Sequence, residues 1–519
     1  MTGGFVQLRD TRFVALGQAA DAWQAYGRQA AALEDRSVQT LIGPLRRSGW
    51  AGPAASAALP QADTVDDQFE IRARTARLID VVLDEASARF AQLQSALHDE
   101  VEAARTAGFR VGEDGVAQPI HDEEASAADA WTDRIAAVVK RAGQLDDQVA
   151  GVLAGLRPDG QGKTGADDWN RMSDAAEDVA VWLGVDPKRV PPPGSSPQRV
   201  ADWWKGLSDQ QRQLYLDAYP QLVGNLDGLP ATDRDSANRL TLRSHLAELT
   251  TGDGDARDLE RSQRLLDRLE RNEYGDPNEQ LFLLGIDNSG DGRAIVAVGN
   301  PDDAANTCVL VPGVGTTLDG MTGQIDRATT MQRGAYAQAV GTGESVSVIA
   351  WLGYDAPEAD WSAISHKRAE AGAPLLDGFV DGLHVTHGNG PAHTSVLGHS
   401  YGSTVVGNAA HDGNGLAADD IITAGSPGMD VNTVADLQID PQHVWAGAAK
   451  DDPIAGPLGS IWGIHDNEPT DPSFGANRFH VDTSGHSGYW AADSQSLANI
   501  SRVVIGDYDH VTLDHGHAP

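Results

Sequence analysis

Apolar positions follow two different spacings and divide the chain into a helical first part and a second part that alternates strands with helices. Between about residues 8 and 45, apolar and small residues recur mostly three, four or seven positions apart, the spacing of one helix face. A second run of this kind follows at residues 79–101. The members of the two runs are Leu16, Trp23, Tyr26, Ala30, Leu33 and Leu41, and Ile79, Leu83, Ala86, Phe90, Leu93, Leu97 and Val101. The pattern predicts two long helices joined by a turn.

More helix is predicted up to residue 280. Segments 108–111 and 115–118 look like a small two-stranded connector, and apolar spacing predicts a third long helix from about 123 to 156. Gly and Pro residues at 157–163 then indicate a boundary or hinge. The predicted domains are a helical hairpin (1–110), a connector with a long helix (111–165), a helical lead-in or cap (166–280) and a strand-rich domain (281–519).

Short apolar runs alternate with helical segments from residue 281 on. The first two runs flank Asp287–Gly292, which begins like a calcium loop but has Val298 where the bidentate Glu of such a loop belongs, so a hairpin turn is predicted. Early hairpin strands followed by strand–helix alternation predict an antiparallel start and a parallel remainder. The strand candidates are 281–286, 293–298, 307–311, 346–351, 394–397, 419–424, 442–448 and 477–481.

Composition excludes several classes of function. The 39 basic and 75 acidic residues give a net charge of −36, which repels nucleic acids and anionic membrane surfaces. The single cysteine, Cys308, lies in an apolar run and is predicted to be a buried, inert thiol. The start of the chain lacks the pattern of a secretory signal peptide. We therefore expect a cytoplasmic protein or one exported without a classical signal peptide.

The strongest chemical motif is Gly398-His399-Ser400-Tyr401-Gly402, directly after the strand candidate 394–397. In a G-x-S-x-G nucleophile elbow the serine occupies a strained strand-to-helix turn, and the glycines keep side chains out of the bend. With Gly at 57 of 519 positions, the bare pattern also arises by chance. The flanking strand and helix therefore decide whether it is interpreted as a nucleophile elbow. On the elbow, the strand count and the order of the groups that follow, the chain resembles the α/β-hydrolase superfamily.

That resemblance implies a base and an acid in the chain order Ser, Asp or Glu, His. A serine hydroxyl needs such a base to become a nucleophile, and the base needs an acid to orient it. Asp452 follows a predicted strand and matches the acid position of the superfamily, with Asp451 as the alternative. His486 lies in a glycine-rich loop after the last predicted strand, whereas its nearest rival, His480, lies within the strand.

The oxyanion that forms on the substrate carbonyl requires two hydrogen-bond donors. One should be the backbone N–H of Tyr401, and by analogy with the superfamily the other is that of Val314, with Gly315 second. Supporting roles at the same edge of the sheet are assigned to Gly313, Gly315, His399 and Ser426. Neither a cofactor nor a metal is expected.

Several motifs together resemble an actinobacterial α/β-hydrolase family of unknown function over about residues 165–510. The lead-in to the sheet, Asn225–Ala231 with Arg234 and Asn238, belongs to this resemblance. It implies an esterase-like or lipase-like serine hydrolase that forms an acyl-enzyme on Ser400 and acts on a small or lipid-like acyl ester. Amide or thioester cleavage remains an alternative, and so does a helical lid over the site.

The first hundred residues carry a second resemblance. Trp50-Ala51-Gly52 lies between the two predicted helices, and this arrangement resembles the Trp-x-Gly helical hairpins of type VII (ESX) secretion. The likeness implies an interaction or secretion-associated protein, with a helical partner or self-association through residues 1–110. Pro60 is expected to interrupt the second helix, and the Tyr-x-x-x-Asp tail signal of that family occurs only at Tyr489–Asp493.

Overall fold

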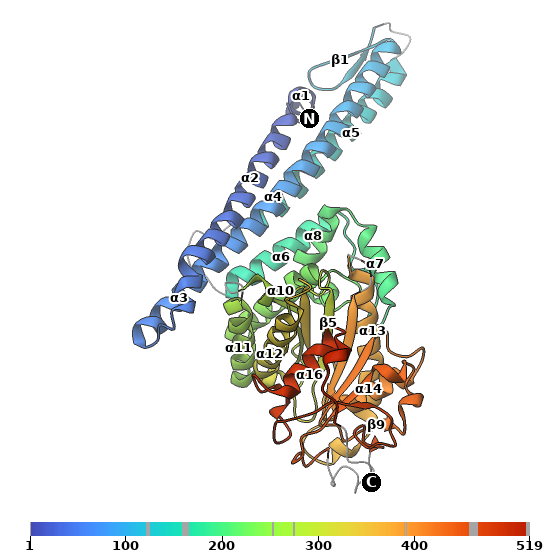
Figure 1. The fold of residues 1–519 in the computed structure, drawn as a ribbon. Helices are drawn as coiled ribbons and strands as arrows, with labels where there is room; N and C mark the ends of the chain where they lie inside the picture. Colours follow the sequence, from blue (N-terminus) through green and yellow to red (C-terminus); the bar gives the residue numbers. More distant parts are fainter. Residues whose placement is uncertain are drawn as a thin grey trace. The chain divides into compact units, whose positions relative to one another are not determined.

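The computed structural model describes residues 2–120, 125–157, 166–251, 254–272, 276–388, 390, 392–455 and 465–514. The chain forms two compact units, Met1–Asp186 and Pro187–Pro519, whose elements are shown in Figure 1. This division differs from the predicted domain boundaries after residues 110, 165 and 280. The predicted boundary after 165 and most of the hinge at 157–163 lie outside the described residues.

The first unit is helical, with one short antiparallel connector. Strands β1 (Phe109–Val111) and β2 (Ala117–Pro119) pair antiparallel, which confirms the predicted connector. The helices are α1 (Thr2–Asp10), α2 (Val14–Ser37), the π-helical η1 (Val38–Ile42), α3 (Gly43–Arg47), α4 (Pro53–Thr106), α5 (Ala125–Gly155) and α6 (Ala166–Trp182).

Helices α2 and α4 run antiparallel. Phe13, just before α2, stacks on Phe90 with ring centroids 4.9 Å apart, and the Ser87 hydroxyl donates to the Phe13 carbonyl at 3.0 Å. Further along α2, a Cβ on Gly27 would lie 3.4 Å from the Ala76 Cβ. The residue numbers of the contacts therefore decrease along α4 as they increase along α2, as in an antiparallel pair. Small residues allow the two helices to approach closely.

One expectation for these helices was wrong. Helix α4 continues from Pro53 through Pro60 to Thr106, because the loss of one backbone donor is small against its packing along α2. The apolar run of α2 lies largely on the surface, since small residues make the contact with α4. Its exposed members are Trp23, Tyr26, Leu33 and, in η1, Leu41, which are 38%, 45%, 47% and 52% exposed.

The second unit contains the mixed sheet. Its strands are β3 (Leu281–Asp287), β4 (Arg293–Val298), β5 (Asn306–Val311), β6 (Val346–Trp351), β7 (His393–His399), β8 (Asp420–Ala424), β9 (Gly428–Val431), β10 (Val444–Gly447), β11 (His465–Asp466) and β12 (Asn477–Arg478). Its α-helices are α7 (Pro197–Lys205), α8 (Asp209–Ala218), α9 (Pro220–Val223), α10 (Ala231–Thr251), α11 (Ala256–Asn272), α12 (Met321–Ala339), α13 (Lys367–Thr386), α14 (Gly402–His411) and α16 (Gln495–Val504).

Eight strands form the main sheet in the order β12-β10-β8-β7-β5-β6-β4-β3. Strands β3 and β4 are antiparallel and the pairs from β5 to β12 are parallel, so the predicted mostly parallel sheet with an antiparallel start is confirmed. Helices α12 and α16 cover one face, and α13 and α14 the other (Figure 1). The small parallel pair β9–β11 was not predicted, because strands this short show no periodicity.

The free edge of β3 is covered by side chains from the preceding helical segment. Asn225 exchanges two hydrogen bonds of 2.9 Å with the backbone of Ile286. Asp235 on α10 accepts from the N–H of Leu283, and Asn238 donates to the Leu283 carbonyl at 3.0 Å. Since these contacts satisfy an edge that could otherwise pair with another chain, the lead-in is part of the sheet domain.

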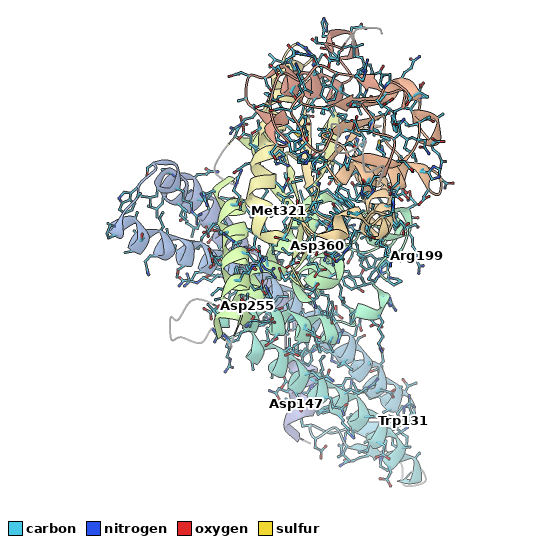
Figure 2. All side chains as sticks on the ribbon, turned by 90° about the horizontal axis from the view of Figure 1, so that it is seen from below. Trp131, Asp147, Arg199, Asp255, Met321 and Asp360 are labelled. Carbon is cyan, nitrogen blue, oxygen red and sulfur yellow. The ribbon has the colours of Figure 1, made fainter. Side chains whose placement is uncertain are left out.

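Side chains fill the interior of each unit. Figure 2 draws all the described side chains on the ribbon, with Trp131 and Asp147 labelled on α5 of the first unit and Met321 at the start of α12 of the second. Cys308 is free and buried as predicted, and burial raises the pKa of its thiol to about 12. Among the described helices, none combines the length and apolar character that crossing a bilayer requires.

Candidate active site

Ser400 lies at a sharp turn between β7 and α14, at the carboxyl edge of the parallel strands. Its backbone has φ +55°, a left-handed conformation that is strained for a residue with a side chain, and the residue is 7% exposed. A Cβ on Gly398 would lie 2.4 Å from the Ser403 Cα, and one on Gly402 would lie 2.2 Å from the Val311 carbonyl oxygen. Both glycines are therefore required for the turn, as the motif predicts.

His486 and Asp452 lie together at this edge. The His486 Nδ1 is 2.9 Å from each carboxylate oxygen of Asp452, and Asp452 is buried. Burial alone would raise the pKa of Asp452, but hydrogen bonds from His486 and Tyr489 lower it to about 2. Asp451 instead accepts from the N–H of Gly485 at 2.8 Å, so it anchors the histidine loop.

Tyr489 is a residue of this site to which the sequence analysis assigned no role. Its hydroxyl donates to Asp452 and accepts from the N–H of Ala449 at 3.1 Å. The side chain is fully buried, so the Tyr489–Asp493 match is not an exposed tail signal. Its position three residues after His486 was the only available sequence signal, and its meaning depends on the fold of that loop.

His399, next to Ser400, supports the loop that carries His486. Its Nε2 lies 2.8 Å from the His486 carbonyl oxygen, and the two ring centroids are 4.9 Å apart. Burial, and then the positive charge of Arg327, lower the pKa of His399 to about 3. The ring is therefore neutral near pH 7, and it donates its Nε2 hydrogen to that carbonyl.

The loop after β8 makes room for Asp452. A Cβ on Gly425, which has φ +59°, would lie 2.7 Å from the Asp452 Oδ2. The Ser426 hydroxyl is hydrogen-bonded to the Ser403 hydroxyl at 2.6 Å and accepts from the N–H of Gly428 at 3.1 Å. Ser426 therefore holds this loop against the start of α14.

The loop after β5 approaches the Ser400 side chain closely. A Cβ on Gly313 would lie 2.7 Å from the Ser400 Cβ and 3.1 Å from its hydroxyl oxygen. The N–H of Gly315 donates to the Pro357 carbonyl at 2.8 Å, so it is already engaged. The backbone N–H groups of Val314 and Tyr401 have no acceptor among the described residues. Of the two candidates in this loop, Val314 is thus the one whose donor is free.

Comparison with known proteins supports an α/β-hydrolase fold. A family model described as "Alpha/beta hydrolase" matches residues 287–460. Uncharacterized protein Rv2079 of Mycobacterium tuberculosis is 30% identical over 385 residues, which are 63% of this chain and 58% of that protein. Uncharacterized protein Mb0988c of Mycobacterium bovis is 30% identical over 233 residues, 42% of this chain and 83% of that protein. The chain belongs to the α/β-hydrolase family.

These matches cover only part of the compared proteins, which limits the conclusions that they support. This α/β hydrolase spans 58% of the length of the first curated relative, whose remaining part has no counterpart in the match. A solved structure, the crystal structure of esterase PE8, is 18% identical and covers 38% of this chain and 91% of its own, at a TM-score of 0.26. A likeness at that score carries no argument about fold or activity.

In this α/β hydrolase the Ser400 hydroxyl is not hydrogen-bonded to the His486 ring. Among the residues that the structure describes, no hydrogen bond joins the two side chains, and the Nε2 of His486 has no partner. Hydrogen bonds of this kind are often long before substrate binds. The free Nε2 is the nitrogen that could accept a proton from Ser400.

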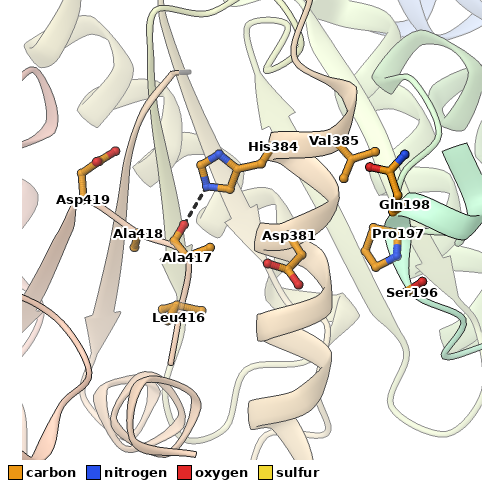
Figure 3. Close-up of a pocket in the computed structure, with 10 residues that line it drawn as sticks. All are labelled: Ser196, Pro197, Gln198, Asp381, His384, Val385, Leu416, Ala417, Ala418 and Asp419. Carbon is orange, nitrogen blue, oxygen red and sulfur yellow. Dashed lines mark hydrogen bonds between the residues drawn. The ribbon is translucent and has the colours of Figure 1, made fainter. Parts of the chain in front are cut away.

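A hollow of about 570 Å³ lies elsewhere in the same unit. It is bounded by the start of α7, the end of α13 and residues 416–419, which lead into β8. His384 on its wall contacts the Ala417 carbonyl oxygen at 2.7 Å (Figure 3). Because residues 416–419 precede β8, this hollow lies at the amino edge of the parallel strands, opposite Ser400, and we do not assign the substrate to it.

Proposed function

We propose that the protein is a serine hydrolase that cleaves a carboxylic ester through an acyl-enzyme on Ser400. The observation that carries the proposal is the contact between His486 and the buried Asp452, at the same edge of the sheet as a serine held at φ +55°. Membership of the α/β-hydrolase family supports hydrolysis in general. The choice of an ester rests on the resemblance of the motifs to esterases and lipases.

Asp452 gives His486 the tautomer that the first step needs. A carboxylate 2.9 Å from Nδ1 keeps the hydrogen on that nitrogen, so the Nε2 lone pair can accept the Ser400 proton. The Ser400 oxygen then bonds to the carbonyl carbon of the ester, whose oxygen becomes an oxyanion. The N–H groups of Tyr401 and Val314 would stabilise that negative charge.

His486 then returns the proton to the leaving alcohol, and the ester C–O bond breaks to give an acyl group on Ser400. Water attacks this acyl group, and His486 takes its proton as general base. The tetrahedral intermediate formed by this attack then breaks down, which releases the carboxylic acid and restores the serine hydroxyl. The same residues would serve a thioester or an amide, so the leaving group is a matter for experiment.

Labelling with a fluorophosphonate tests the nucleophile. We expect the wild-type protein to be labelled and Ser400→Ala to be unlabelled, with Ser473→Ala, an exposed serine of the same unit, as the matched control. Equal labelling of wild type and Ser400→Ala would refute the proposal. Chromogenic esters of graded chain length, with a thioester and an anilide of the preferred acyl group, then rank the leaving groups.

Self-association through the helical unit, the interaction role implied by the Trp-x-Gly resemblance, is a second candidate function. The exposed apolar run on α2 favours it, because residues at this spacing suit docking of another amphipathic helix. Sedimentation should show an oligomer that Trp23→Ser with Leu33→Ser dissociates while ester hydrolysis is unchanged. A monomeric wild type at tens of micromolar would contradict this role.

A further inference from the structure

A second group of polar side chains in the Pro187–Pro519 unit converges on one carboxylate oxygen. His366 lies at the start of α13, Asp430 on β9 and His465 on β11. The Asp430 Oδ1 is 2.7 Å from the His366 Nδ1 and 3.1 Å from the His465 Nδ1. One possible ligand atom from each residue lies within 4.8 Å of the other two.

The hydrogen-bonding pattern of His465 is incomplete without a positive charge. Its Nε2 lies 3.2 Å from the Ala363 carbonyl oxygen and its Nδ1 lies 3.1 Å from the Asp430 Oδ1, and both oxygens can only accept. A neutral ring carries one hydrogen, so one of these two contacts would then join two acceptors. His465 is 3% exposed, so water does not relieve this contact. A cation, or an additional proton on the ring, would satisfy it.

We propose that His366, Asp430 and His465 bind a divalent transition-metal ion, for which zinc is the best match. Two imidazole nitrogens and one carboxylate are donors that zinc accepts, whereas calcium and magnesium prefer oxygen ligands alone. In tetrahedral zinc coordination neighbouring ligand atoms are about 3.3 Å apart, close to the 2.7 Å and 3.1 Å that separate the Asp430 Oδ1 from the two histidine nitrogens. The His366 side chain is 46% exposed, so the fourth position is open to water.

Outer contacts already orient two of the three ligands. The side chain of Asn408 on α14 donates to the Asp430 Oδ2 at 2.8 Å, which leaves the Oδ1 for the ion. The Ala363 carbonyl fixes the His465 ring through its Nε2. Partners of this kind set the orientation of ligands in metal sites and strengthen their binding.

The proposed ion would connect three segments around the residue that follows Ser400. The Tyr401 ring packs edge-on against the His465 ring at 5.3 Å, and its hydroxyl accepts from the N–H of Ala369 on α13 at 3.2 Å. An ion held by α13, β9 and β11 would therefore stiffen the support of Tyr401. It would act on stability and on the position of Tyr401, with no contact to substrate, and it does not depend on the proposed esterase activity.

Zinc binding to the full chain tests this inference. The protein is stripped with a chelator, loaded with zinc chloride and desalted, and its zinc content and thermal unfolding are measured for wild type and His366→Ala. His510→Ala is the matched control, because His510 is also exposed and lies 2.6 Å from a carboxylate, that of Asp507. His366 is near the surface, so its replacement should leave the fold intact.

We expect one zinc per chain in wild type and in His510→Ala, with a rise in Tm of at least about 3 °C on loading. In His366→Ala affinity should fall by more than about 100-fold and the rise in Tm should vanish. Asp430→Asn, which keeps the shape of the side chain, should behave like His366→Ala. Equal zinc in all the proteins, or none in wild type at about pH 8, where imidazoles are neutral, would overturn the proposal.

Discussion

Two buried aspartates face histidines at opposite edges of the same sheet, yet only one of them has the surroundings of an active site. Asp452 at the carboxyl edge contacts His486 and Tyr489. Asp420 begins β8 at the amino edge and is surrounded by four donors at 2.7–3.0 Å. These donors are His393, His443, Trp445 and Tyr508.

The two regions differ in whether a ring nitrogen of the histidine remains without a hydrogen-bond partner. Both ring nitrogens of His393 are engaged, Nδ1 by the Val504 carbonyl at 3.0 Å and Nε2 by Asp420 at 2.8 Å. His486 uses only Nδ1, and among the described residues its Nε2 has no partner. A histidine–aspartate contact is therefore no evidence of catalysis by itself. The unpartnered nitrogen of His486, at the edge of the sheet that carries the serine elbow, is what distinguishes the candidate site.

Removing the nucleophile should give the largest effect. Ser400→Ala is expected to lower kcat for the best ester by at least about 10⁴-fold, because no other group can carry the acyl intermediate. Tm should stay within a few degrees of wild type or rise, since alanine removes only a hydroxyl. Steady-state kinetics with active-site labelling measure this effect, and a retained rate above about a tenth of wild type would break the assignment.

Replacing each aspartate by asparagine separates the two regions directly. Asp452→Asn should lower kcat by about 10³–10⁴-fold, because the amide favours the wrong tautomer of His486. Asp420→Asn should instead reduce the free energy of unfolding by about 3–5 kcal/mol, since it removes a buried charge from its donors. Its kcat should stay near wild type wherever the protein is folded. Similar losses of kcat in both variants would erase the distinction.

The sequence alone was sufficient to predict the elements whose pattern lies within one short stretch of the chain. Strands β4 and β6 were predicted with their observed bounds, because a buried strand reads as a continuous apolar run between turn residues. The elbow lies within one stretch of five residues, 398–402. Asp452 and His486 were found through the chain order that the superfamily implies. Their roles remain predictions.

Contacts between residues far apart in the chain could not be predicted from the sequence. His366, Asp430 and His465 share no spacing, and only the fold brings them together. The apolar run of α2 was placed on one helix face, but periodicity does not say whether that face is covered. In α2 the small residues Ala20 and Gly27 are buried instead, a choice that depends on the partner helix.

The two tyrosines make a smaller, matched comparison. Tyr489 donates to Asp452, and Tyr508 donates to Asp420 at 2.7 Å. Phenylalanine at either position should lower the free energy of unfolding by about 1.5–3 kcal/mol, the range for a hydrogen bond to a charged group. Only Tyr489→Phe should also lower kcat, by about tenfold, since Asp452 then holds His486 less firmly. Chemical denaturation and ester kinetics measure both, and a tenfold drop in kcat for Tyr508→Phe would contradict the comparison.

The smallest effect is a dependence of stability on pH that His393 causes at the amino edge. Burial would lower the pKa of His393, but the hydrogen bond with Asp420, the charge of that carboxylate and the contact with the Val504 carbonyl together outweigh it and raise that pKa above its usual value near 6.5. A raised pKa in the folded state means that folding favours the charged ring. Its contribution to stability is therefore complete below about pH 6.5 and declines as the pH rises through the folded-state pKa.

Denaturation of wild type and His393→Gln across about pH 5.5–9 checks the sign. The stability advantage of wild type should be largest at the acidic end of this range and shrink toward the alkaline end. Asp452 behaves in the opposite sense, because its lowered pKa gives stability above about pH 4 that is lost as the pH falls toward 2. An advantage of wild type over His393→Gln that grew with pH would mean that His393 is neutral in the folded protein, and the Asp420 cluster would then be a hydrogen-bonded network without an ion pair.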